Sequence, residues 1–136
     1  MRANRKYEVY SLARGNMEKE KIDLRDLILK IKEHKQLNTN VALEWDCYIE
    51  TDDVKPLVKV INYVINYINQ LTDQPLHISL NATHRGITAS FTAFTTLSDF
   101  PEISPKVSEA LQPYNAELEQ KGEPGKYAQL SIHFKD

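Results

Sequence analysis

The chain has 136 residues, of which 41% are hydrophobic and 26% are charged. These proportions are ordinary for a globular protein, and the length suits one domain spanning residues 1–136. The formal net charge of −2 provides no attraction to nucleic acid or to an anionic membrane surface. No apolar run approaches the roughly 20 residues that span a bilayer, so neither partner is expected.

Cysteine usage and the N-terminus indicate a cytoplasmic protein. The single cysteine, Cys47, excludes an internal disulfide framework and suits a reducing compartment. The first ten residues are basic but lack the apolar core of a secretory signal. We expect residues 1–20 to form an N-terminal arm before a core at 21–136. Within the arm, the MEKEK run reads as a connection, and an edge strand would contain Tyr7, Val9 and Leu12.

Hydrophobic spacing predicts a helix and then a strand in the first part of the core. The helix begins near Asp23, which can cap it, and its apolar residues recur at helical spacing through Ile31. Residues 41–50, VALEWDCYIE, alternate between apolar and polar side chains, which is typical of a half-buried strand. The face of that strand expected to point inward carries Val41, Leu43, Trp45, Cys47 and Ile49.

The strongest periodicity lies between Asp53 and Leu71. Asp53 can cap this predicted helix, and Pro56 fits its first turn. One broad face is apolar, and Tyr63 and Tyr67 flank the opposite polar stripe. These tyrosines are either exposed at an interface or at the edge of the core. The polar stripe consists of Lys55, Lys59, Asn62, Asn66 and Asn69.

The remaining segments predict a hairpin, a helix and a closing strand. Strands at 76–82 and 87–96 are joined by a tight turn in which Gly86 supplies the permissive backbone. A helix follows, capped by Ser104, kinked at Pro113 and continuing through Leu118. A strand at 126–134 closes the chain. The fold class is therefore α/β, an α+β two-layer sandwich. Its mixed, largely antiparallel sheet has four or five strands with helices on one face.

The order of elements and the asparagine spacing resemble the ATP-binding domain of the GHKL group, which includes histidine kinases. The N-box of these kinases reads V-x-x-N-L-L-x-N-A, and residues 60–67, VINYVINY, fall into the same frame. The resemblance covers roughly residues 8–135, including the closing GEPGKYAQLSIHF. It implies a Bergerat-type fold, ATP with Mg²⁺ as cofactor, and bacterial two-component signalling. Asn66 would ligate Mg²⁺ with Asn62 in support, and Asn69 stands where the kinases carry a phosphate-binding lysine.

The sequence departs from this family after the hairpin. The family has D-x-G-x-G there, with the Asp on adenine, whereas residues 95–99 are Thr-Thr-Leu-Ser-Asp. No glycine occurs between Gly86 and Gly122, so the glycine-rich lid over the phosphates is missing. Phosphate cradles need the close backbone approach that glycine allows. Asp99 is the candidate for a displaced adenine ligand. The predicted vestigial nucleotide site is Asn62, Asn66, Asn69 and Asp99.

No catalytic residue is predicted. The four histidines lack metal-binding spacing, and residues 1–20 contain no phospho-accepting histidine. Cys47 lies on the inward face of its strand without a paired base, and no GxSxG elbow is present.

Three functions follow. The first is a non-catalytic, degenerate kinase-like domain that binds a signalling protein or itself, as a homodimer. The second is a functional ATP/Mg²⁺ domain, a kinase or anti-sigma-like protein with an abbreviated site. It would use Asn66 for the metal, Asn62 in support, and Asp99 or Thr95 near adenine. The third is an unrelated small α/β ligand-binding domain, which a parallel, helix-crossed sheet would indicate.

Overall fold

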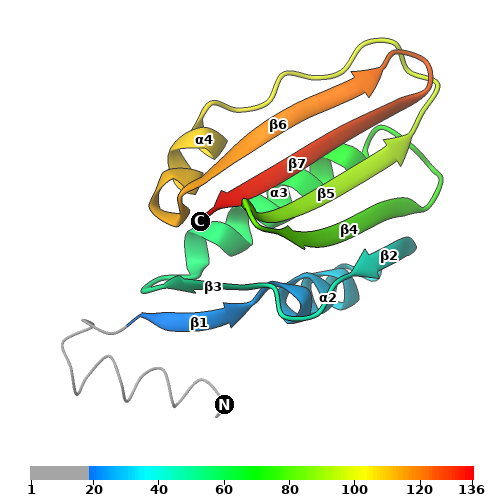
Figure 1. Ribbon diagram of the computed structural model, residues 1–136. Coiled ribbons are helices and arrows are strands. Elements are labelled where there is room, and N and C mark those ends of the chain that lie inside the picture. The colour runs from blue at the N-terminus through cyan, green and yellow to red at the C-terminus, as the bar shows by residue number, and fades with distance from the viewer. Residues whose placement is uncertain (1–18) are drawn as a thin grey trace.

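The computed structural model describes residues 19–136, so nearly all of the expected arm, including its edge strand, lies outside the described residues. Five strands form the main sheet in the order β2-β4-β5-β7-β6, and β1 pairs with β3 in a separate two-stranded sheet (Figure 1). The elements are β1 (Glu20–Asp23), α2 (Leu24–Lys35), β2 (Thr39–Leu43), β3 (Tyr48–Thr51), α3 (Lys55–Asn69), β4 (Leu76–Thr83), β5 (Gly86–Phe94), α4 (Lys106–Leu111), a 3₁₀ turn η1 (Gln112–Tyr114), β6 (Ala116–Glu123) and β7 (Tyr127–Lys135).

The main sheet is mixed and largely antiparallel, as predicted. Only β2 and β4 are parallel, and the other three pairings are antiparallel. Helix α3 lies behind the sheet and covers one of its faces (Figure 1). Side chains from β4, β5 and β7 alternate, so one set is buried beneath the helices and the other lies on the open face. The buried set is Leu76, Ile78, Leu80, Ala89, Phe91, Ala93, Ala128, Leu130, Ile132 and Phe134.

The turn between β4 and β5 requires glycine. Gly86 has φ of +132°, and a Cβ there would lie 2.0 Å from the carbonyl oxygen of Phe134. A side chain would therefore collide with the backbone of β7 across the sheet. The predicted hairpin is confirmed, with Thr83 paired with Gly86.

The strand predicted at residues 41–50 is wrong as a single element. It is divided into β2 and β3, which belong to different sheets. Asp46 adopts a left-handed φ of 61° between them and redirects the chain. Val41 and Trp45 are consequently exposed rather than inward, with Trp45 69% exposed, whereas Cys47 is buried as expected.

The helix predicted to continue to Leu118 is also wrong. Helix α4 ends at Leu111, and the turn η1 carries Pro113. Asn115 then takes a left-handed φ of 53° and reverses the chain into strand β6. Proline cannot donate the hydrogen bond that a continuing helix needs, and pairing with β7 satisfies the following backbone instead. The cap predicted at Ser104 is partly correct, because its hydroxyl accepts from the N–H of Lys106 at 3.2 Å, although the residue that directly precedes α4 is Pro105.

Strand β1 was not predicted. Its residues, which begin with Glu20 at the end of the expected arm, pair antiparallel with β3. The cap expected at Asp23 is confirmed, because its carboxylate accepts from the N–H groups of Arg25 at 3.0 Å and Asp26 at 3.3 Å. No helix within residues 19–136 has the length and apolarity needed to cross a membrane.

Candidate functional site on helix α3

Helix α3 is held by its apolar face, which buries Leu57, Ile61, Val64, Ile65 and Ile68 in the core. The predicted cap is partly correct. The carboxylate of Asp53 accepts from the N–H of Lys55 at 3.0 Å, although the residue that directly precedes the helix is Val54.

A second cap comes from Tyr114 in η1. Its buried hydroxyl accepts from the N–H of Leu57 at 3.0 Å and donates to the carbonyl of Asp53 at 2.7 Å. This satisfies one of the four N–H groups that the first turn of any helix leaves unpaired. Burial raises the pKa of the Tyr114 hydroxyl above its ordinary value of 10.0, which keeps it protonated as a donor. The local sequence carries no signal for this contact.

The asparagine stripe keeps to one side of α3, but its three amides have different surroundings. Asn62 is half-buried and donates to the carbonyl of Val58 in its own helix at 3.0 Å. Asn66 is exposed, and its side-chain oxygen accepts from the ammonium of Lys35, at the end of α2, at 3.0 Å. Asn69 is exposed at the last position of the helix. The oxygen expected to ligate Mg²⁺ is thus bonded to a lysine.

The loop after β5, residues 95–105, contains the remaining predicted ligands, and its first part is held by hydrogen bonds. Thr95 is buried, and its hydroxyl donates to the carbonyl of Leu71 at 2.5 Å. The N–H of Gly125, in the β6–β7 turn, donates to the carbonyl of Leu97 at 2.8 Å. Asp99 is exposed. Within residues 19–136, the side-chain hydrogen bonds of Asn62 and Asn66 go to Val58 and Lys35 and not to one another or to Asp99.

Two tyrosines of α3 fasten the second part of this loop. The hydroxyl of Tyr67 donates to the carbonyl of Pro101 at 2.6 Å, and the hydroxyl of Tyr63 accepts from the N–H of Ser104 at 2.9 Å. Tyr67 is 3% exposed, and Tyr63 packs at the edge of the core. Burial raises the pKa of the Tyr67 hydroxyl. The structure therefore favours the second of the two roles considered for these tyrosines, a position at the edge of the core.

A groove of about 500 Å³ runs between α3 and α4, beside the stripe. Its floor is apolar, and three ammonium groups line it against a single carboxylate, that of Asp53. The apolar lining is Pro56, Val60, Tyr63, Val107 and Ala110, and the lysines are Lys55, Lys59 and Lys106.

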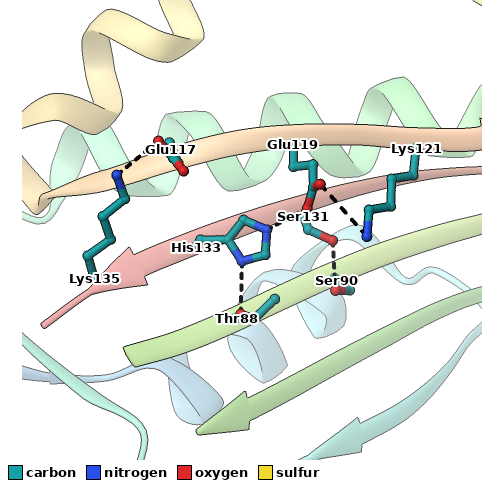
Figure 2. Close-up of polar contacts among 8 residues, drawn as sticks. All are labelled: Thr88, Ser90, Glu117, Glu119, Lys121, Ser131, His133 and Lys135. Atoms are coloured by element: carbon teal, nitrogen blue, oxygen red, sulfur yellow. Dashed lines mark hydrogen bonds and ion pairs between the residues drawn. The ribbon is translucent and has the colours of Figure 1, made fainter. Parts of the chain in front are cut away.

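A different polar cluster lies on the open face of the sheet (Figure 2). His133 on β7 is bonded through Nε2 to Glu119 on β6 at 2.8 Å and through Nδ1 to Thr88 on β5 at 2.9 Å. The hydrogen bond between His133 and Glu119 lowers the pKa of the Glu119 carboxyl, which is ionised at neutral pH and accepts the Nε2 proton. The hydroxyl of Thr88, which can both donate and accept, is bonded to Nδ1 on the other side of the ring.

The order hydroxyl, imidazole, carboxylate is also found in nucleophilic enzymes, but the surroundings here differ. Thr88 and His133 lie opposite each other in strands that are paired on both sides. Their backbone N–H groups are used in the sheet and cannot stabilise an oxyanion. The cluster acts as a set of cross-strand contacts that order the open face.

Within residues 19–136, no group of three or more His, Cys, Asp and Glu side chains is arranged to hold a metal ion. Of the residues expected to serve the nucleotide, Asn66 and Asn69 are both exposed on the face of α3 that carries Lys55 and Lys59, and the side-chain oxygen of Asn66 is bonded to Lys35.

Comparison with solved structures shows the same architecture in histidine kinases. The Acinetobacter baumannii histidine kinase AdeS matches with a TM-score of 0.68 and 11% identity, over 96% of this chain and 74% of that chain. The ATP-binding domain of PrrB from Mycobacterium tuberculosis matches with a TM-score of 0.63 and 14% identity, over 87% of this chain and 97% of that one. The chain has the GHKL fold.

The histidine kinase domain of the E. coli osmosensor EnvZ has a TM-score of 0.67 at 10% identity, over 88% of this chain and 89% of that one. No protein-family model matches the sequence, and no curated protein matches it. At these identities the likeness concerns the fold alone. The parallel, helix-crossed sheet that would have indicated an unrelated α/β domain is not what the main sheet shows, because this sheet is largely antiparallel and matches the kinase domains.

Proposed function

We propose that this GHKL-type domain has lost its nucleotide chemistry and works as a regulatory module that binds a signalling protein. One observation carries the proposal. The loop that follows β5 is short, has no glycine, and is fastened to α3 by Tyr67 and Tyr63. A lid that closes over phosphates needs freedom to move and backbone positions that approach the ligand closely. The fastened loop provides neither.

The contact between Asn66 and Lys35 supports the same proposal. The ammonium of Lys35 is bonded to the amide oxygen of Asn66, so it occupies the position and supplies the positive charge that a bound Mg²⁺ would have there. Metal binding would first have to displace this lysine and then overcome repulsion from it.

The groove between α3 and α4 is where we propose that the partner binds. An apolar floor bordered by Lys55, Lys59 and Lys106 complements an amphipathic segment that has apolar residues flanked by Asp or Glu. The apolar contact would supply affinity, and the lysines would orient the segment and speed its association.

The alternative is a functional ATP/Mg²⁺ site of abbreviated form. The observation that favours it is the exposed amide of Asn66, whose oxygen already accepts from a cation, the ammonium of Lys35. In that case Asn66 would exchange Lys35 for Mg²⁺, and Lys35 would move to a phosphate.

Calorimetric titration separates the two functions. ATP and a non-hydrolysable analogue would be added with and without Mg²⁺ to the wild type, to Asn66→Ala and to Gln70→Ala, which alters an exposed amide at the end of α3 outside the predicted site. We expect no binding heat up to about 1 mM nucleotide, an affinity of roughly −4.1 kcal/mol. Mg²⁺-dependent binding near or below about 100 μM, roughly −5.5 kcal/mol, that only Asn66→Ala abolishes would contradict the proposal.

Partner binding needs a separate test, with a synthetic amphipathic helix that carries glutamates beside its apolar face. We expect saturable binding that weakens on Lys59→Glu and as salt rises. A peptide of the same composition in scrambled order is the control. Equal binding of both peptides, or no change on Lys59→Glu, would rule out the groove.

A further inference from the structure

The two edges of the main sheet are protected to different degrees. Strand β6, at one edge, carries a charged side chain at every second position from Glu117. Glu117, Glu119 and Lys121 are drawn on the open face in Figure 2. Glu117 pairs with Lys135 at 3.0 Å, and Glu119 lies 2.8 Å from His133 and 3.7 Å from Lys121. Charged residues on an edge strand prevent another strand from adding to it, because pairing would bury or crowd them.

Strand β2, at the other edge, has no such protection. Its five residues, TNVAL, include no charge, proline or glycine. Asn40, Val41 and Ala42 are all exposed, and Val41 is 42% exposed although Ile78, its partner on β4, is 2% exposed. No strand within residues 19–136 pairs with the outer side of β2 (Figure 1). Its backbone therefore presents unpaired N–H and C=O groups beside an exposed valine.

We propose that β2 is a dimerisation edge, on which a second copy of this chain adds its own β2 antiparallel. The two copies would be related by a twofold axis at Val41, so that each Val41 lies opposite its counterpart. The two five-stranded sheets would then form one continuous ten-stranded sheet. This inference concerns the opposite end of the sheet from the partner-binding groove and does not depend on it.

Charge complementarity indicates a second copy rather than an unrelated strand. The chain has a net positive charge just before β2, where the last turn of α2 carries Lys32, His34 and Lys35 beside the single acidic residue Glu33. It is acidic just after β2, at the exposed Glu44 and Asp46. Antiparallel addition brings the basic end of one copy next to the acidic end of the other, twice by symmetry.

The flanking apolar residues complement each other in the same register. Trp45 is 69% exposed, and its ring is stacked against the guanidinium of Arg25, 3.8 Å from the ring centroid. Positions 37 and 45 lie two residues before and two residues after β2, so a twofold axis at Val41 brings position 45 of one copy to the same end of the added strand as position 37 of the other. Position 37 is Leu37, which is half-buried at the edge of the core. Pairing would therefore cover an indole ring at each end of the added strand.

Sedimentation of the full 136-residue chain tests the dimer. We expect a mass of two chains at high concentration, and self-association weakened at least roughly tenfold by Val41→Lys, since two like charges would face each other at the axis. Val41→Thr, which keeps a β-branched residue, should still dimerise. Ser108→Lys, which adds the same charge on exposed α4, should dimerise as the wild type does. Circular dichroism would establish that every variant is folded.

A mixing experiment tests the register. Val41→Lys and Val41→Glu should each be monomeric alone, and their equimolar mixture should form a heterodimer, because only at a twofold axis does position 41 face itself. A wild type that remains monomeric at about 1 mM, roughly −4.1 kcal/mol, would overturn the proposal. So would a dimer that tolerates Val41→Lys, or a mixture of the two charged variants that stays monomeric.

Discussion

Helix α3 and the loop at residues 95–105 contact each other, yet they differ in how closely each follows the sequence motifs of the kinase ATP-binding domains. The helix keeps the asparagine spacing and is held by an apolar face that is buried throughout. The loop lacks the glycines and is held by hydrogen bonds from Thr95, Tyr63 and Tyr67. A fold depends on the buried face of a helix and tolerates change in an exposed loop, so the same architecture is compatible with a loop sequence that differs from the kinase motif.

The largest contrast is expected between the two faces of α3 itself. Ile61→Ala should lower the free energy of unfolding by about 2–5 kcal/mol, because it leaves a cavity at a side chain that is 1% exposed. Asn66→Ala, on the opposite face, should change it by no more than about 0.5 kcal/mol. Urea unfolding followed by circular dichroism measures both. A comparable loss in the two variants would mean that the asparagine stripe is part of the folding core.

The next largest effect concerns the start of α3. Tyr114→Phe removes the hydroxyl that accepts from Leu57 and leaves a buried N–H without a partner. The expected cost is about 1–3 kcal/mol, measured in the same unfolding experiment. Tyr127→Phe, at a half-buried tyrosine on β7, is the matched control and should cost less. An equal cost would show that the cap contributes nothing.

A smaller effect is expected at the loop. Tyr67→Phe removes the bond to Pro101 and should cost about 1 kcal/mol. Amide hydrogen exchange should become faster in residues 96–104 and stay unchanged in β5 and β7, because the loop opens locally while the sheet remains closed. Unchanged exchange in residues 96–104 would show that the tyrosine does not hold the loop, and the main support for the proposed function would be lost.

The smallest expected effect is a change in the free energy of unfolding at alkaline pH, and it involves the tyrosine that holds the loop and the tyrosine that caps α3. Burial raises the pKa of the Tyr67 and Tyr114 hydroxyls in the folded state above the ordinary 10.0. Their contribution to stability is complete below pH 10 and falls as pH rises toward the folded-state pKa, because the unfolded chain ionises first. The double variant Tyr67→Phe, Tyr114→Phe should show a shallower alkaline loss of stability than Tyr127→Phe. Parallel pH profiles would contradict this assignment.

The predicted helices and hairpin were correct where periodicity alone decides them. The apolar spacing of α2 and α3, the alternation of β4, β5 and β7 and the glycine turn at Gly86 all formed as expected. Two predictions were wrong at reversals of the chain that depend on a single backbone angle. Asp46 and Asn115 adopt left-handed conformations that alternation and helical spacing do not reveal.

The candidate site divides in the same way. The sequence by itself determined that three asparagines and two lysines share one side of α3, because helical geometry fixes the faces of a periodic segment. It also determined that the glycine box is missing. Only the tertiary structure decided that Lys35 reaches Asn66, that Tyr114 caps α3, and that Tyr63 and Tyr67 fasten the loop. These contacts join residues 31–57 positions apart, and such separations are closed by packing of the whole core, which no local pattern specifies.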